Sequence, residues 1–255
     1  MICIRGDRRF VSIGFVAGIF GHARSMPEEG SELYKLITVK GSDTLVFLQG
    51  QLTQDVMRLK GSGRLLSAWC NAKGRVVAII RLVACRDAIG LLVPADMADR
   101  IVERLNLYRL RSKVEFGAPS DDWKDLIDAD AADPVELIRA GIATIDESNS
   151  EQFTPHMLNL DKLGAISFTK GCYTGQEVVA RTEHLGKSKR RLMRYRADAD
   201  GIVPGDKLSD GEREVGTVVN VVGRDLLAVT PVDLHEQTLT AGEVAVAPEG
   251  LPYEL

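Results

Sequence analysis

Residues 170–177, which read Lys-Gly-Cys-Tyr-Thr-Gly-Gln-Glu, constrain the fold of this chain most strongly. Thr174 and Glu177 stand three apart, immediately before the apolar residues Val178 and Val179. That spacing is typical of a capping box, in which the threonine hydroxyl accepts from the third helical N–H and the glutamate reaches back to the cap. Gly171 permits a tight turn or a close approach of backbone to a ligand. The stretch therefore predicts a helix capped by Thr174.

This placement puts Cys172 just outside a helix N-terminus, with Lys170 beside it. A helix N-terminus and a neighbouring ammonium both favour the thiolate, which is the reactive form of cysteine. A lone cysteine is more commonly a small buried hydrophobe. The spacing alone does not decide between the two interpretations, and under the first of them Cys172 and Lys170 are candidate catalytic residues.

Composition excludes several classes of protein. The chain has 255 residues, of which 45% are hydrophobic and 27% charged, and its net charge is −4, so any site for nucleic acid must be local. The four cysteines include no C-x-x-C pair, which argues against a zinc framework, and we expect no bound metal. A core of this size needs no disulfides, so we expect a reducing, cytoplasmic compartment. No run approaches the roughly 18 apolar residues of a membrane span.

Residues 1–30 differ from the rest of the chain. Arg5, Arg8 and Arg9 precede the apolar run 11–20, which loosely imitates a signal peptide. We favour a disordered or mis-started extension, with Met26 as the natural beginning, because the remainder has the character of a cytosolic protein.

Residues 31–140 read as a mixture of strands and helices. A helix capped by Ser42 leads into the amide-rich loop 49–55, and a helix after Pro94 buries a stripe ending at Tyr108. The turn 71–74, Asn-Ala-Lys-Gly, joins two strands into a hairpin. The expected strands are 36–39, 65–70, 76–83, 89–93 and 114–116, and a short helix is expected at 134–140. His156 is expected to be a surface or hydrogen-bonded side chain, since no ligand partner stands at metal-binding spacing.

The C-terminal part predicts a small antiparallel barrel. Short alternating runs at 217–222, 226–230 and 244–247 are separated by glycine-containing turns. Before them, residues 187–196 from Lys187 to Arg196 are strongly basic, which suits a weak anion or RNA contact or, equally, a solvated strand face.

Several motifs coincide at separations that match a known family. They are residues 170–177, the run 47–55 (Phe-Leu-Gln-Gly-Gln-Leu-Thr-Gln-Asp), the block 140–168 and the ending Leu251-Pro252-Tyr253. Together, across about residues 31–255, they closely resemble the YgfZ branch of the YgfZ/GcvT folate-binding family. The resemblance implies an α+β fold in which three domains form a GcvT-like cloverleaf around a central channel, with a C-terminal antiparallel β-barrel.

The same resemblance implies the domains and the ligand. We expect a discontinuous folate-binding domain (31–55 with 115–188), a second α+β domain (56–114) and a barrel (189–255). Tetrahydrofolate, or a folate derivative, would occupy the channel, and the implied partners are iron–sulfur enzymes, including tRNA-modifying ones, or their assembly factors. The expected folate-binding residues are Tyr34, Gln49, Gln51, Arg139, Tyr173, Gln176, Glu177 and Arg181.

The chain departs from the related aminomethyltransferases in its acids. Cys172 stands where the aminomethyltransferases have an aspartate, and Arg139 stands where a glutamate that recognises the pterin is expected. Proton transfer at the folate needs such an acid. The sequence therefore favours a folate-binding accessory protein that uses a reactive cysteine. A folate-dependent one-carbon transferase is the alternative.

Overall fold

The computed structural model describes residues 33–124, 126, 132–185 and 188–255. The expected N-terminal extension 1–30 and Lys187 lie outside the described residues. No helix within them is long and apolar enough to cross a membrane.

A five-stranded antiparallel sheet forms the first half of the structure. Its strands are β1 (Tyr34–Lys40), β2 (Arg64–Cys70), β3 (Val76–Ala84), β4 (Ile89–Pro94) and β5 (Glu115–Phe116), in the order β2-β3-β4-β1-β5. The turn between β2 and β3 is the predicted hairpin, closed by Gly74 N–H donating to the Asn71 carbonyl (2.9 Å). Gly74 has a φ of 68°, which glycine adopts without strain.

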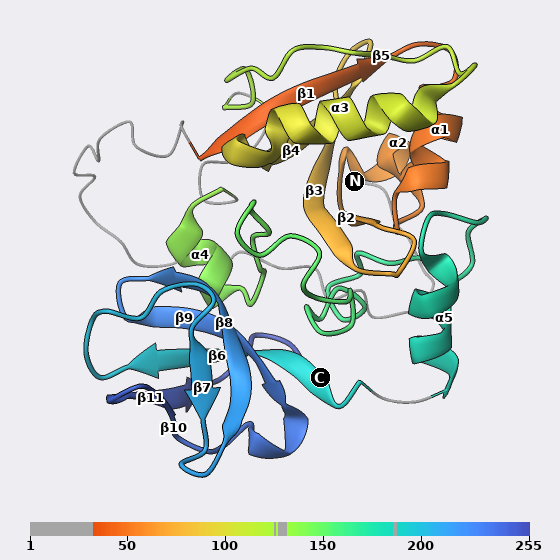
Figure 1. Ribbon diagram of the computed structural model, residues 1–255. Coiled ribbons are helices and arrows are strands. Elements are labelled where there is room, and N and C mark those ends of the chain that lie inside the picture. Colours follow the sequence, from red (N-terminus) through yellow and green to blue (C-terminus); the bar gives the residue numbers. More distant parts are fainter. Residues whose placement is uncertain (1–32, 125, 127–131, 186–187) are drawn as a thin grey trace, which may run out of the picture.

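Helices cover one face of this sheet. They are α1 (Thr44–Gln51), η2 (Val56–Arg58), α2 (Leu59–Ser62), η3 (Ala95–Met97) and α3 (Ala98–Arg109), and α3 runs across the sheet in Figure 1. The predicted stripe of α3 is buried at Ile101 and Leu105, whereas Tyr108 is 43% exposed. The Tyr108 ring meets Trp69 edge-on, with centroids 6.3 Å apart, so the stripe ends in an aromatic contact rather than in the core.

The other face packs against an irregular segment and the second half of the chain. The short helix α4 (Pro134–Arg139) and the loops up to residue 175 fill this layer, and α5 (Gln176–Leu185) follows. A single apolar cluster joins Ile79 of β3, Phe153 and Leu158 of the irregular segment, and Val219 and Leu227 of the C-terminal strands. The two halves therefore pack together through this shared apolar cluster.

The C-terminal strands close into a barrel. They are β6 (Arg190–Ala197), β7 (Lys207–Ser209), β8 (Glu214–Val222), β9 (Asp225–Pro231), β10 (Leu239–Ala241) and β11 (Val244–Glu249), with η5 (Val232–Leu234), in the cyclic order β10-β11-β6-β9-β8-β7. This confirms the predicted α+β class and the C-terminal antiparallel barrel.

The predicted domain boundaries stay a prediction. β1, from the segment 31–55, lies between β4 and β5 and hydrogen-bonds to both, so this segment shares a sheet with residues 64–94. The proposed division at residue 56 therefore cuts through one hydrogen-bonded sheet.

Candidate functional site

The segment 170–177 is docked on the β2–β3 turn. Gly175 has a φ of 83°, and a Cβ there would lie 2.4 Å from the Asn71 carbonyl oxygen and 3.2 Å from the Gly74 nitrogen. Two glycines therefore allow two backbones to touch. This contact fixes where α5 can begin.

The predicted capping box is wrong in register. The first helical hydrogen bond runs from Val179 N–H to the Gly175 carbonyl (3.4 Å), so Gly175 holds the N-cap position that was predicted for Thr174. The Glu177 carboxylate instead accepts from Arg181 Nη2 at 2.6 Å, on the exposed face of α5. The close approach to the hairpin turn, which no local spacing reveals, moved the cap by one residue.

This contact makes Gly175 sensitive to substitution. Gly175→Ala should lower the free energy of unfolding by roughly 2–4 kcal/mol, because it adds both left-handed strain and a steric clash. Gly171→Ala is the matched control, since a Cβ there meets nothing within 4 Å. Urea unfolding of the two variants measures the difference, and equal stabilities would show that the two backbones do not touch.

Lys170 is held by backbone carbonyls at the end of α1. Its Nζ donates to the carbonyls of Gln49 (2.6 Å), Leu52 (2.6 Å) and Gln54 (3.2 Å). A cation at this place satisfies carbonyls that a helix end leaves open and complements the helix dipole. Burial lowers the pKa of Lys170 to about 8, against the opposing effect of the Asp55 carboxylate. Lys170 therefore anchors the segment to α1, which is a different role from the predicted one of favouring the Cys172 thiolate.

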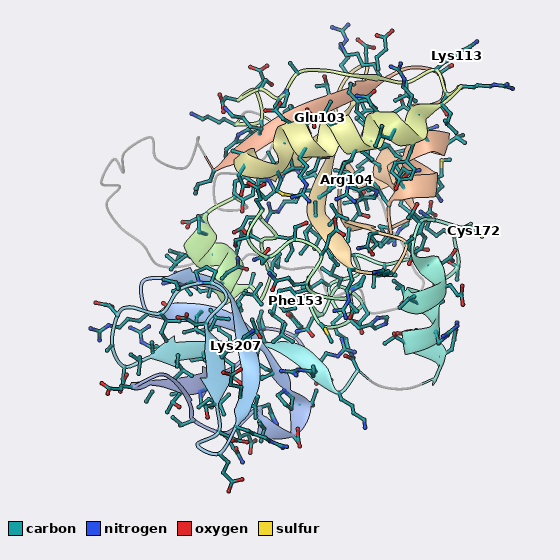
Figure 2. The ribbon with its side chains drawn as sticks, viewed as in Figure 1. Glu103, Arg104, Lys113, Phe153, Cys172 and Lys207 are labelled. Atoms are coloured by element: carbon teal, nitrogen blue, oxygen red, sulfur yellow. The ribbon has the colours of Figure 1, made fainter. Side chains whose placement is uncertain are left out.

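Tyr173 and Cys172 point to different environments. Tyr173 is buried, its ring centroid lies 5.1 Å from Lys170 Nζ, and burial beside Cys70 raises its pKa. Burial also raises the pKa of the Cys70 thiol to about 12. Cys172 is exposed beside the N-terminal end of α5 (Figure 2). This outcome excludes the interpretation of Cys172 as a buried hydrophobe.

The side-chain amides of Gln49 and Gln51, both predicted folate ligands, differ in their hydrogen bonding. The Gln49 side chain is used internally, since Oε1 accepts from Val56 N–H (2.8 Å) and Nε2 donates to Asp55 (2.9 Å). The Gln51 Oε1 is buried and has no hydrogen-bond partner among the described residues. Gln51 thus keeps a free acceptor, whereas Gln49 shapes the loop.

A cavity of about 440 Å³ lies beside Tyr34 at the junction of β1, α4 and β8. The Tyr34 hydroxyl is 3.1 Å from Thr144 Oγ1, and Trp123 Nε1 donates to the Tyr34 carbonyl (3.1 Å). The Arg81 guanidinium lies 5.2 Å from the centre of the Tyr34 ring. From the barrel side, Asn220 of β8 bonds both backbone groups of Thr144: its Oδ1 accepts from the Thr144 N–H (2.9 Å), and its Nδ2 donates to the Thr144 carbonyl (2.9 Å). The cavity is therefore walled by an aromatic ring and by fixed polar groups from both halves of the fold.

Two acids that the sequence analysis missed line this cavity. Asp96 Oδ2 accepts from Glu147 N–H (3.0 Å), and Asp146 Oδ1 accepts from the N–H (2.9 Å) and hydroxyl (2.6 Å) of Ser148. Each carboxylate keeps one oxygen outside these bonds. Asp96 comes shortly after the strand that ends at Pro94, and Asp146 comes directly after the apolar run that ends at Ile145. An acid at the end of such a run was the sequence signal that could have indicated them.

The other predicted folate ligands do not line this cavity. Arg139 is exposed and pairs with Glu136 (2.6 Å), while its neighbours Leu137 and Ile138 face the cavity. Gln176, Glu177 and Arg181 lie on α5, which is on the opposite side of the view from the Tyr34 end of β1 (Figure 1). Of the predicted set, Tyr34 contributes to this cavity, and the structure keeps it apart from the segment 170–177.

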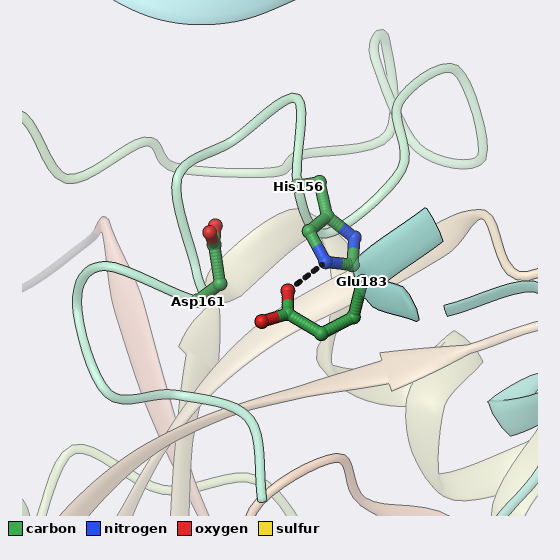
Figure 3. A group of neighbouring side chains, drawn as sticks. All are labelled: His156, Asp161 and Glu183. Carbon is green, nitrogen blue, oxygen red and sulfur yellow. Dashed lines mark hydrogen bonds and ion pairs between the residues drawn. The ribbon is translucent and has the colours of Figure 1, made fainter. Parts of the chain in front are cut away.

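His156 belongs to a polar cluster that sequence spacing did not reveal. Its ring is buried, and its Nε2 lies 3.1 Å from Glu183 Oε2 of α5, with Asp161 close by (Figure 3). Ligand atoms of the three residues lie within 4.8 Å of one another, which is close enough for a cation. However, Arg191 Nη1 already neutralises Asp161 at 2.6 Å and donates to the His156 carbonyl (3.1 Å). We therefore assign the cluster to holding α5 and β6 on the irregular segment.

Three arginines of the basic stretch, on strand β6 of the barrel, are paired with acids in the fold. Arg191 pairs with Asp161, Arg194 with Glu249, and Arg196 with Asp225 (3.3 Å). Arg190 donates to the Val215 carbonyl. These three ion pairs reduce the charge on which the anion or RNA prediction rested, and they favour the alternative of a strand face.

No family model matches the chain. A Haemophilus influenzae protein described as uncharacterised is 29% identical over 269 residues, covering 87% of this chain and 96% of the relative. The tRNA-modifying protein YgfZ of Yersinia pestis is 26% identical, covering 87% of this chain and 91% of that protein, and YgfZ of Yersinia pseudotuberculosis matches equally well.

The chain is a YgfZ homologue. This confirms the family resemblance that the motif 170–177 indicated. The glycine cleavage system aminomethyltransferase T of Bartonella henselae has the same fold, with a TM-score of 0.66, 16% identity, and coverage of 86% of this chain and 83% of that one. The GcvT-like fold of this YgfZ homologue is thereby confirmed as well.

Proposed function

We propose that this YgfZ homologue binds tetrahydrofolate in the cavity beside Tyr34 and offers Cys172 to iron–sulfur enzymes, including tRNA-modifying ones. The observation that carries the proposal is the cavity itself, in a chain with YgfZ relatives and an aminomethyltransferase fold. Three unpaired thiols among the described cysteines agree with the cytoplasm as its compartment.

The lining of the cavity fits a folate ring system. About 440 Å³ lies within the range of small-molecule sites, and the walls are mainly apolar around Tyr34, Leu137 and Ile138. The flat pterin ring suits the Tyr34 side of the cavity. Its amino and ring N–H donors suit the free oxygens of Asp96 and Asp146. When bound, tetrahydrofolate would supply a one-carbon carrier.

Cys172 would act at the surface rather than at the folate. It is exposed and lies at the N-terminal end of α5, where a partner enzyme can reach it (Figure 2). One thiol cannot hold an iron–sulfur cluster, because such clusters take four protein ligands. The partner must therefore supply the remaining ligands, and Cys172 would serve as a transient ligand or as a nucleophile.

A second candidate is a folate-dependent one-carbon transferase. The specific observation in its favour is the pair Asp96 and Asp146 in the cavity, which provides acids that the sequence analysis found missing at the aligned positions. Formation of methylene-tetrahydrofolate from an amine donor by the purified protein would establish it. Absence of turnover with folate binding intact leaves the accessory role.

Folate binding is tested at Tyr34. Calorimetric titration with tetrahydrofolate should show binding to the wild type, and Tyr34→Leu should weaken it about tenfold, because the variant keeps bulk but removes the aromatic face. Trp123 reports the location, since its ring meets Tyr34 edge-on at 6.4 Å.

The matched control is Phe116→Leu, which also removes an aromatic ring. Phe116 lies on β5, opposite Val39, at the other end of β1 from Tyr34. Its affinity should equal that of the wild type. Equal affinities for all three proteins, or binding that leaves Trp123 emission unchanged, would place the folate elsewhere.

A further inference from the structure

A second cavity, of about 390 Å³, lies where β1 ends, α1 begins and the β3–β4 turn folds over. It shares no lining residue with the Tyr34 cavity. Tyr34 and Lys40 are the two ends of β1, so the cavities are roughly 20 Å apart. We propose that this second cavity binds the phosphate group of a small phosphate monoester.

Positive charge gathers around this cavity. Lys40, Lys60 and Arg86 line it and are exposed, and none of them has an ion-pair partner in the described parts of the chain. Among the lining residues that the structure describes, Asp87 carries the one carboxylate. In contrast to the paired arginines of β6, these cations are available to an anion. The excess of positive charge suits a dianionic phosphate.

The N-terminus of α1 adds unused donors. Asp43 holds the N-cap position of this eight-residue helix but makes no side-chain cap bond. Its carboxylate instead accepts from Lys113 N–H (2.8 Å) and the Ser42 hydroxyl (3.0 Å). The first-turn N–H groups of Leu45 and Val46 have no acceptor in the described residues. Open amides at a helix N-terminus bind phosphate groups.

Thr44 is an independent sign of a missing partner. It lines the cavity, it is only 6% exposed, and its hydroxyl has no hydrogen-bond partner among the described residues. A buried hydroxyl without a partner is costly. A phosphate oxygen entering beside the α1 amides would supply the acceptor once the hydroxyl rotates toward it.

The size and lining favour a small molecule over RNA. The volume lies at the lower end of the range for small-molecule sites. None of the described residues that line it is aromatic, so they offer no ring on which a base could stack. A phosphate with a short organic body fills such a cavity, whereas single-stranded RNA would gain charge contacts alone.

Cys85 provides a direct footprint, because its half-buried thiol lines the cavity. The full-length protein is alkylated with iodoacetamide, an uncharged reagent, and the alkylation of each cysteine is quantified by peptide mass spectrometry. Four parallel reactions contain inorganic phosphate, ribose 5-phosphate, tRNA or potassium chloride at matched ionic strength. Both small phosphates should slow alkylation of Cys85 about fivefold, with Cys172 unaffected as the internal control. Equal rates in phosphate and chloride, or protection by tRNA alone, would overturn the proposal.

Variants locate the charge contribution. Lys60→Ala and Arg86→Ala should each weaken binding of ribose 5-phosphate about tenfold, as expected for loss of one charge-assisted hydrogen bond. Lys207→Ala, which removes an exposed lysine from the barrel, is the control and should bind as the wild type does (Figure 2). Equal affinity in all three variants would assign the footprint to another part of the protein.

Discussion

Cys172→Ala should reduce tRNA modification by a dependent iron–sulfur enzyme to the level of a strain that lacks the protein. The reason is that Cys172 is the exposed thiol of the family motif, whereas Cys70 is buried with its pKa raised to about 12. The measurement is the amount of the modified nucleoside in bulk tRNA, by mass spectrometry, in a deletion strain carrying each variant.

The control for this experiment is Cys85→Ala, which removes the half-buried one of the three described cysteines. It should support modification as the wild type does. Both proteins should unfold at the wild-type urea midpoint, because the Cys172 side chain is exposed and makes no core contact. Wild-type levels of the modified nucleoside with Cys172→Ala would show that Cys172 is not needed for tRNA modification.

Lys170→Met should destabilise the protein by roughly 2–3 kcal/mol, because it leaves three part-buried carbonyls without their charged donor. Methionine keeps an unbranched apolar side chain, so the loss measures the ammonium, including its place over the Tyr173 ring. The measurement is the free energy of unfolding in urea, at neutral pH where the wild-type amine carries its proton.

Lys207→Met is the matched control, since its ammonium is exposed and, within the described residues, bonds to Thr217 alone (3.1 Å). We expect its stability to stay within about 0.5 kcal/mol of the wild type. If Lys170→Met keeps full stability yet loses support of tRNA modification, the anchoring role is wrong, and the predicted role of Lys170 in favouring the Cys172 thiolate is supported instead.

Local signals were enough to predict most of the elements. Asp133 accepts from Val135 N–H and Pro134 begins α4, so this short helix carries its own start signal. The hairpin turn at 71–74 and the strands β8, β9 and β11 were likewise predictable from turn residues and alternation.

Contacts between distant segments could not be predicted from local pattern. Lys170 reaches carbonyls that precede it by more than a hundred residues. Arg191 finds Asp161, and Glu183 finds His156, across loops without a regular period. The basic stretch and the lone histidine were therefore interpreted without the acids that the fold places beside them.

The Tyr34 cavity shows the same division. Tyr34 was expected from the family resemblance, and it lines the cavity. Asp96, Asp146 and Asn220 come from three other parts of the chain, and only the packing of the barrel on the sheet brings them to one cavity. No spacing within the sequence connects these positions.

The central proposal is that folate binds in the cavity beside Tyr34 and that this cavity is separate from the exposed thiol of Cys172. Saturating tetrahydrofolate is added to the wild type, and the emission of Trp123, identified against Trp123→Phe, is followed together with the alkylation rate of Cys172. The account predicts a changed Trp123 emission with an unchanged Cys172 rate. Protection of Cys172 without any change at Trp123 would contradict it.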